Sequence, residues 1–129
     1  MAQGVIRFTI DTPPRSKKNS QKIVMNKKTG RPFIMYSDAY KAYRKAALML
    51  IPAEARQHIE YAVNVKALFF METRRRVDLN NLTEALCDVL VEAGVVGDDN
   101  SNIVAGMDGS RVLYDREHPR TEVTITRME

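Results

Sequence analysis

Residues 74–99, RRRVDLNNLTEALCDVLVEAGVVGDD, decide how this chain folds, because they contain its clearest helix. Apolar residues recur here at helical spacing, which predicts an amphipathic helix over residues 78–93. Its apolar stripe consists of Leu79, Leu82, Leu86, Val89, Leu90 and Ala93. Asp78 is well placed as the N-cap, and Gly94 as the residue just beyond the C-terminus. The helix can therefore bury one face and turn its polar residues to solvent.

A basic run precedes this helix and an acidic turn follows it. Arg74–Arg76 come just before Asp78, and Asp98–Asp99 come just after Val95–Val96. A helix of this length extends for about 24 Å at 1.5 Å per residue, so a straight helix keeps Asp78 and Asp99 apart. Two arrangements stay open: the chain folds back along the helix, or the acids meet across the interface between two copies.

The acids suit phosphodiester hydrolysis, which needs an activated water and a counter to the charge that builds on phosphorus. Divalent metal ions supply both, and carboxylates hold such ions. Magnesium takes oxygen ligands, often only one or two carboxylates with water and substrate phosphate. Each acid also has an ordinary structural explanation, because Asp is a preferred N-cap and Asp98–Asp99–Asn100 is a typical turn.

Charge is divided unevenly along the chain, although the net charge is only +4. Residues 1–77 contain 16 Lys and Arg against 5 Asp and Glu, whereas residues 78–129 contain 4 against 11. The first part can attract a polyanion and the second can hold cations. Ordinary segregation of surface charge is the alternative explanation.

The rest of the chain predicts a small α+β domain. A β-branched run predicts a strand at 5–10, and two apolar runs around a Gly-containing turn predict a hairpin with a basic tip over 23–36. Ser37 is expected to cap a helix that Pro52 ends. Further strands are expected at residues 60–71, 103–114 with a break near 106–109, and 121–126. We therefore expect one domain, residues 1–129, with a mixed β-sheet packed against two main helices.

Composition excludes several other classes of protein. The chain has 129 residues and a single cysteine, Cys87, so it has neither a disulfide framework nor a cysteine zinc cluster. His58 and His118 are too far apart in sequence for metal-ligand spacing. The N-terminal residues do not form a signal peptide, and no apolar stretch is long enough to span a membrane. These features fit a soluble protein of the reducing cytoplasm.

Three segments together resemble a known family. Residues 78–82 (DLNNL), 87–90 (CDVL) and 93–99 (AGVVGDD) are similar to the RusA family of Holliday-junction resolvases, many of which prophages encode. The family pattern begins Asp-x-Asp-Asn-Leu, has a lysine four residues after the second Asp, continues with Asp-x-Leu and ends in Gly-x-x-x-Asp-Asp. The basic N-terminal part, with Pro13–Pro14–Arg15, also resembles the family.

The resemblance implies a homodimer that binds four-way DNA junctions and makes paired cuts with Mg²⁺, or with Mn²⁺ as a substitute. It also implies that acids distant in sequence converge. By position, Asp78 matches the first catalytic aspartate of the family, and Asp99 matches an aspartate of the final Asp-Asp pair. Asp98 and Asp88 match further acids of the pattern, whose catalytic role has weaker support. The expected metal ligands are Asp78, Asp99, Asp98 and Asn80.

Two positions depart from the family pattern. Asn80 stands at the second aspartate and Glu84 at the lysine. Residues 80 and 84 share a helix face about 5–6 Å apart, so our hypothesis is that Glu84 supplies the carboxylate that Asn80 lacks, and that it joins Asp78 and Asp99 as a catalytic residue. A cation from Arg74–Arg76 or Arg111 would then replace the lysine at the phosphate.

The basic part of the chain is expected to grip DNA. The residues expected to contact DNA are Arg15, Lys17, Lys18, Lys27, Lys28, Arg74, Arg75 and Arg76. Because of the two departures, a protein of the same fold that binds branched DNA without cutting it is the alternative. A general nucleic-acid-binding module is a third possibility, but the lack of Trp and an aromatic content of 7% argue against a base-stacking single-strand binder.

Overall fold

The computed structural model describes residues 5–17 and 22–128. Its framework is a five-stranded sheet with the order β1-β7-β4-β5, in which β6 also pairs with β4. The elements are β1 (Val5–Ile10), β2 (Lys22–Met25), β3 (Pro32–Met35), α1 (Asp38–Leu50), the 3-10 turn η2 (Ala53–Ala55), β4 (Val63–Met71), α2 (Leu79–Glu92), β5 (Val104–Gly106), β6 (Arg111–Tyr114) and β7 (Arg120–Arg127).

Strand β4 is the centre of the sheet. It pairs antiparallel with β7 along one edge and parallel with β5 and β6 along the other, so the sheet is mixed. Residues alternate between buried and accessible along β4, with Val63, Val65, Ala67 and Phe69 buried. This period of two turns one face of the strand toward the core and leaves the other to solvent.

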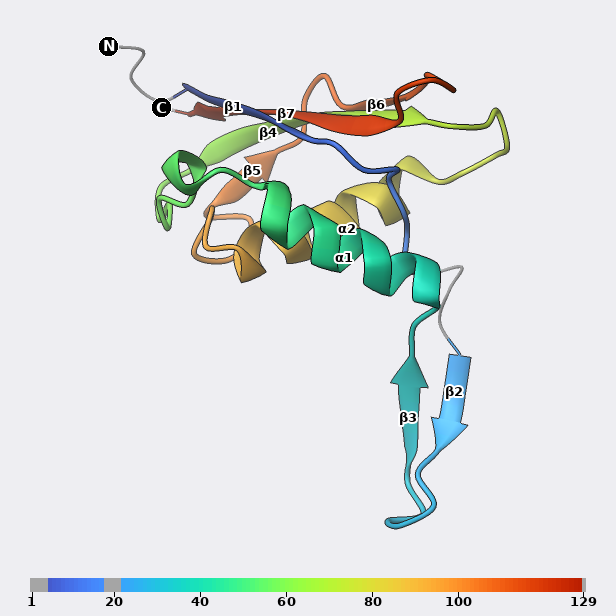
Figure 1. Ribbon diagram of the computed structural model, residues 1–129. Helices are drawn as coiled ribbons and strands as arrows, with labels where there is room; N and C mark the ends of the chain where they lie inside the picture. Colours follow the sequence, from blue (N-terminus) through green and yellow to red (C-terminus); the bar gives the residue numbers. More distant parts are fainter. Residues whose placement is uncertain (1–4, 18–21, 129) are drawn as a thin grey trace.

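Both helices cover the same face of the sheet, and Figure 1 shows the opposite face uncovered. α1 contributes Tyr40, Tyr43 and Ala47 to the core. α2 contributes six residues, Leu82, Ala85, Leu86, Cys87, Val89 and Leu90. Neither helix of the described ranges is long and apolar enough to cross a membrane. The predicted class, α+β with a mixed sheet and two helices, is confirmed.

The chain reverses sharply after α2. Gly94 has φ +77°, a conformation that glycine adopts easily. Val95 and Val96 that follow are fully buried, and Val96 forms a parallel bridge with Ile59 just before β4. These contacts hold the end of α2 beside the start of β4, and they set where the acidic turn begins.

Strands β2 and β3 form a two-stranded hairpin, residues 22–35, which we call the arm. Figure 1 shows that it projects away from the body beyond the start of α1. Its tip is a tight turn in which the side chain of Asn26 accepts hydrogen bonds from the backbone of Lys28 and Thr29. The predicted hairpin with a basic tip is confirmed.

The other predicted elements are confirmed with small differences at their ends. Ser37 caps α1 by accepting a hydrogen bond from the Tyr40 backbone N–H at 3.2 Å. The strand expected at 60–71 begins at Val63, and Ile59 before it forms an isolated bridge with Val96. The strand expected over 103–114 is two strands, separated near Gly109 as predicted.

The reversal at Gly94 yields a stability prediction. A Cβ at this position would lie 3.0 Å from His58 Nε2 on a backbone that disfavours L-residues. Gly94→Ala should therefore lower the free energy of unfolding by about 1–2 kcal/mol from the conformation alone, with the His58 contact adding to it.

Gly30→Ala is the matched control, because Gly30 has φ +71° but nothing within 4 Å of the added Cβ. The same conformational strain then falls on the exposed tip of the arm, so urea unfolding of the body should change less than in Gly94→Ala. Equal losses for the two variants would contradict this account of the turn.

Candidate active site on the polar face of α2

Asp78 begins α2 but does not use its carboxylate as an N-cap. Its backbone is extended, with φ −87° and ψ 124°, and its side chain makes no capping hydrogen bond. Among the described residues, the carboxylate instead accepts a hydrogen bond from the Asn81 side-chain amide at 3.3 Å. Asp78 is exposed. The plain N-cap explanation of this aspartate is therefore wrong for its side chain, which is left facing solvent.

The outward face of α2 is polar along most of its length. Asn80, Glu84 and Asp88 succeed one another at intervals of four residues, which places them one above the other. Asn80 and Glu84 are exposed and Asp88 is half-buried. The opposite face packs into the core, so this orientation follows from the apolar stripe.

The two aspartates after α2 have different surroundings. The Asp98 carboxylate accepts hydrogen bonds from the Asp99 backbone N–H at 2.7 Å and from the Asn100 side chain at 3.1 Å. These bonds, the one from the Asp99 backbone first, hold the pKa of Asp98 below its ordinary value. Asp98 therefore shapes the turn, whereas Asp99 contributes its backbone N–H to the turn and its side chain is exposed. Of this pair, Asp99 has the carboxylate that is more accessible to a metal ion.

Asp99 lies close enough to α2 for its charge to act on Cys87. Burial, with smaller contributions from the charges of Asp99 and Asp88, raises the pKa of the Cys87 thiol to about 12. A thiol with this pKa is not a nucleophile at neutral pH.

One chain does not gather the expected metal ligands at a point. The oxygen donors are of the kind that magnesium prefers, since Asp78 and Asn80 are exposed on the first turn of α2. Over the described ranges, however, no three Asp, Glu, His or Cys residues are grouped so that they could hold a metal ion. Asp78 with Asn80 at the start of α2, and Asp98 with Asp99 in the turn after it, are therefore candidate half-sites.

Arg15, expected to contact DNA, is held in an ion pair. Its guanidinium forms two hydrogen bonds with the Glu72 carboxylate, at 2.6 and 3.1 Å, and a third with the Pro14 carbonyl at 2.8 Å. The bond from Arg15 is the main reason why the pKa of Glu72 lies below its ordinary value. Glu72 directly follows β4, so this pair anchors the segment that leads to Asp78.

Lys17 contacts the polar face of α2. Its ammonium pairs with the Asp88 carboxylate and lies 5.9 Å from the centre of the Tyr36 ring. The hydrogen bond to Asp88 raises the pKa of Lys17 above its ordinary value. The sequence offered no signal for this pairing, because the two residues are 71 positions apart. The Lys17 ammonium therefore lies beside α2, one helical turn beyond Glu84, although Lys17 belongs to the segment that follows β1.

The remaining predicted DNA contacts are spread over two surfaces. Lys27 and Lys28 are exposed at the tip of the arm. The exposed run Arg74–Arg76 leads into Asp78, and the Arg74 guanidinium stacks 4.0 Å from the Tyr114 ring centre. Lys18 lies outside the described residues.

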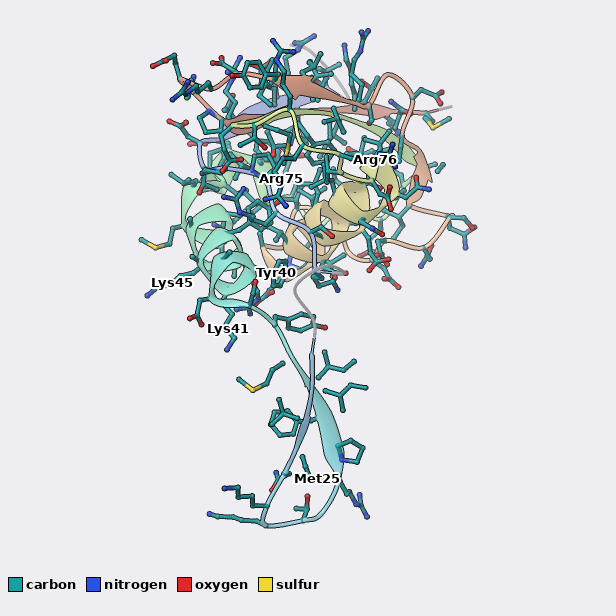
Figure 2. The ribbon with its side chains drawn as sticks, turned by 90° about the vertical axis from the view of Figure 1, so that its right-hand side faces the viewer. Met25, Tyr40, Lys41, Lys45, Arg75 and Arg76 are labelled. Carbon is teal, nitrogen blue, oxygen red and sulfur yellow. The ribbon has the colours of Figure 1, made fainter. Side chains whose placement is uncertain are left out.

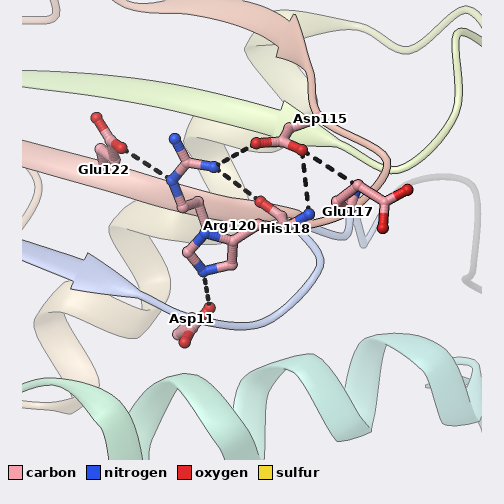
Figure 3. Close-up of polar contacts among 6 residues, drawn as sticks. All are labelled: Asp11, Asp115, Glu117, His118, Arg120 and Glu122. Carbon is pink, nitrogen blue, oxygen red and sulfur yellow. Dashed lines mark hydrogen bonds and ion pairs between the residues drawn. The ribbon is translucent and has the colours of Figure 1, made fainter.

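A second polar cluster supports the end of β4 (Figure 3). Arg120 binds Asp115 at 2.9 Å and Glu122 at 2.8 Å, and its guanidinium stacks 3.9 Å from the Phe70 ring centre. His118 lies 2.6 Å from an Asp11 oxygen, which links the same loop to the segment after β1. The contacts are internal, and this cluster serves as scaffold for the end of β4.

The comparison with protein families bears on this site. A model of the family described as Endodeoxyribonuclease RusA matches residues 11–126. No curated protein matches the chain. The matched range includes all of α2 and the turn after it, and it confirms the resemblance found in residues 78–99.

The pair between Arg15 and Glu72 predicts a pH dependence of stability. A carboxylate whose pKa is lowered on folding stabilises the fold above its unfolded pKa, near 4.5, and loses that contribution as pH falls through the folded value. Urea unfolding of wild type and Arg15→Met should therefore differ most above about pH 5 and converge as the pH falls through the lowered pKa of Glu72.

Arg7→Met is the control for this series. Arg7 is exposed on β1 and forms no ion pair within the described parts of the chain, so its replacement should not change the pH profile. A difference between wild type and Arg15→Met that stays constant from pH 3 to pH 7 would show that the Glu72 carboxylate is not involved.

Proposed function

The chain belongs to the RusA endodeoxyribonuclease family, and from this premise we propose that it resolves Holliday junctions or other branched DNA by metal-dependent, paired phosphodiester hydrolysis. The observation that carries the proposal is the state of Asp78. Its carboxylate is exposed at the start of α2 without the capping bond that would explain it structurally. It also follows the exposed run Arg74–Arg76 with one residue between, and that run could hold a phosphate beside it.

The metal ion that we propose is Mg²⁺, with Mn²⁺ as a substitute. Asp78 and Asn80 would hold it on the first turn of α2, with Asp99 completing the set and Asp98 holding the turn that presents Asp99. The ion supplies activation of a water and neutralisation of charge at the phosphate. Asn80 contributes a neutral oxygen, so the carboxylates of Asp78 and Asp99 provide the negative charge of the site.

A second copy of the chain is the proposed means of bringing Asp99 to Asp78. Within one chain the two aspartates belong to opposite ends of α2, and the described residues group no three metal-ligating acids. A two-fold dimer would juxtapose the start of one α2 with the turn after the other and would create two equivalent sites. Two sites are also what paired cuts require.

Glu84 is proposed as the acid that offsets the loss of charge at Asn80. Both side chains are exposed on the same face of α2, one turn apart. Lys17, which pairs with Asp88 on this face, brings a cation near the position that the family's lysine would occupy. It is a better-placed candidate than Arg111, which lies on β6 in the sheet.

The exposed cations are proposed to hold the DNA strands. Arg74–Arg76 would bind the phosphates next to the cut, whereas Lys27 and Lys28 would bind one arm of the junction. Arg15 and Lys17 act mainly through the ion pairs described above. The bonds of Arg15 with Glu72 position the segment before Asp78.

A DNA-binding protein that has lost catalysis is the second candidate. The observation that favours it is the pair of departures at Asn80 and Glu84, together with the separation of the acids in one chain. Such a protein would bind four-way junctions in Mg²⁺ and leave them intact.

Incubation of the pure protein with an end-labelled four-way junction and a titration of Mg²⁺ or Mn²⁺ separates the two candidates. We expect paired nicks near the branch point that require the metal ion and that Asp99→Asn reduces by a factor of about 100 or more. Tight binding of the junction without any nicks, at every concentration of either metal, would support the binding-only protein.

The role of Glu84 has its own test. Glu84→Gln keeps the size of the exposed side chain and removes its charge, so it should weaken cleavage and raise the Mg²⁺ concentration needed for half-maximal rate. Glu92→Gln is the matched control, because Glu92 lies on the same helix but pairs with Arg44. Unchanged cleavage and metal dependence in Glu84→Gln would eliminate the compensating role.

A further inference from the structure

The arm exposes an apolar surface that the body of the protein does not cover. Ile23, Met25 and Ile34 are 78%, 59% and 54% exposed, and Phe33 is 43% exposed. An isolated two-stranded hairpin has no core of its own and is marginally stable in water. Exposed apolar groups concentrated on one projecting element therefore indicate a surface that a ligand covers.

The register of the hairpin places most of these side chains together. Ile23 pairs with Ile34, and Met25 pairs with Pro32, so these four residues share one face of the ribbon. Phe33 pairs with Val24 and lies on the other face. The first face is thus a continuous apolar stripe, and Figure 2 shows Met25 on the arm well away from the body.

The charge of the arm indicates what covers this stripe. Residues 22–35 contain Lys22, Lys27, Lys28 and Arg31 and no acidic residue. The basic character continues on the body, where Lys41 and Lys45 project from α1 close to the point where the arm leaves it (Figure 2). A second copy of the chain or another protein would have to accept all these cations, whereas a nucleic acid supplies the matching anions.

We propose that the arm enters the branch point of junction DNA, where its apolar stripe contacts unstacked bases while Lys27, Lys28 and Arg31 bind the flanking phosphates. This inference rests on the proposed function and names the part of the molecule that distinguishes a junction from a duplex. DNA-binding proteins insert Phe, Ile, Met and Pro side chains between base steps, and a two-stranded ribbon fits a DNA groove.

The selectivity follows from the cost of exposing bases. In a linear duplex every base is stacked, so insertion of an apolar side chain must first separate two base pairs. At a branch point the stacking is already interrupted, and the stripe can contact bases without that cost. The cations of the arm bind phosphates of either structure, so they contribute affinity without distinguishing the two.

The test compares binding of a four-way junction and of a linear duplex of the same sequence, with Ca²⁺ in place of Mg²⁺ to prevent cutting. The variant is Ile23→Ser with Ile34→Ser, a facing pair whose side chains are 78% and 54% exposed, and circular dichroism checks that it keeps the fold of wild type. It should bind the junction roughly tenfold more weakly and the duplex unchanged. The fluorescence of a 2-aminopurine base at the branch point should increase when wild type binds, because the base is unstacked, and should not increase with the variant.

Two further variants calibrate the result. Met49→Ser removes an apolar side chain that is 77% exposed on α1, and it should leave both affinities unchanged. Lys27→Ala with Lys28→Ala should weaken junction and duplex alike and reduce the salt dependence of both.

The outcomes separate this proposal from the proposed function. Suppose that wild type prefers and cuts junctions, and that the Ile23/Ile34 double variant binds junctions as tightly and gives the same 2-aminopurine signal. The proposed role of the arm is then overturned, whereas the proposed function stands. A double variant that instead changes from dimer to monomer in sedimentation would overturn it by showing that the stripe is an interface between copies. No preference of wild type for the junction would overturn both proposals.

Discussion

The structure depends on the packing of α2 against the mixed sheet. Its buried residues, Leu82, Leu86 and Leu90 among them, belong to the same core as the inward residues of β4. Burial of this stripe determines the rotation of the helix, and the rotation turns Asn80 and Glu84 outward. Apolar packing therefore determines the orientation of the candidate site, and the exposed Asn80 and Glu84 contribute little to the stability of the fold.

The ends of α2 place the two candidate half-sites. Asp78 begins the helix after a segment that Arg15 and Glu72 fasten to the end of β4. Gly94 reverses the chain, and the acidic turn follows it. In the described residues no three metal-ligating acids are grouped within one chain. In the dimer that we propose, metal binding would depend on association, so a monomer would neither bind the metal ion nor cut DNA.

Much of this arrangement was predictable from local sequence pattern. The period of the apolar residues predicted α2, Gly94 predicted its end, and the family pattern predicted Asp78 and Asp99 as a set. The ion pair between Lys17 and Asp88 was not predictable, because it joins residues 71 positions apart without any pattern between them. The side-chain contact of Asp78 was also not predictable, since an aspartate in that position usually caps the helix. Its actual contact depends on the Asn81 rotamer.

We propose that each active site combines Asp78 of one copy with Asp99 of another. The most direct measurement is junction cleavage by mixed dimers of Asp78→Asn and Asp99→Asn, prepared by co-refolding two inactive variants. In such a dimer one site contains both replacements and the other contains both aspartates, so cleavage of a single strand should return. If the mixture stays inactive while wild type mixed with either variant retains activity, the two aspartates act within one chain, and the account is contradicted.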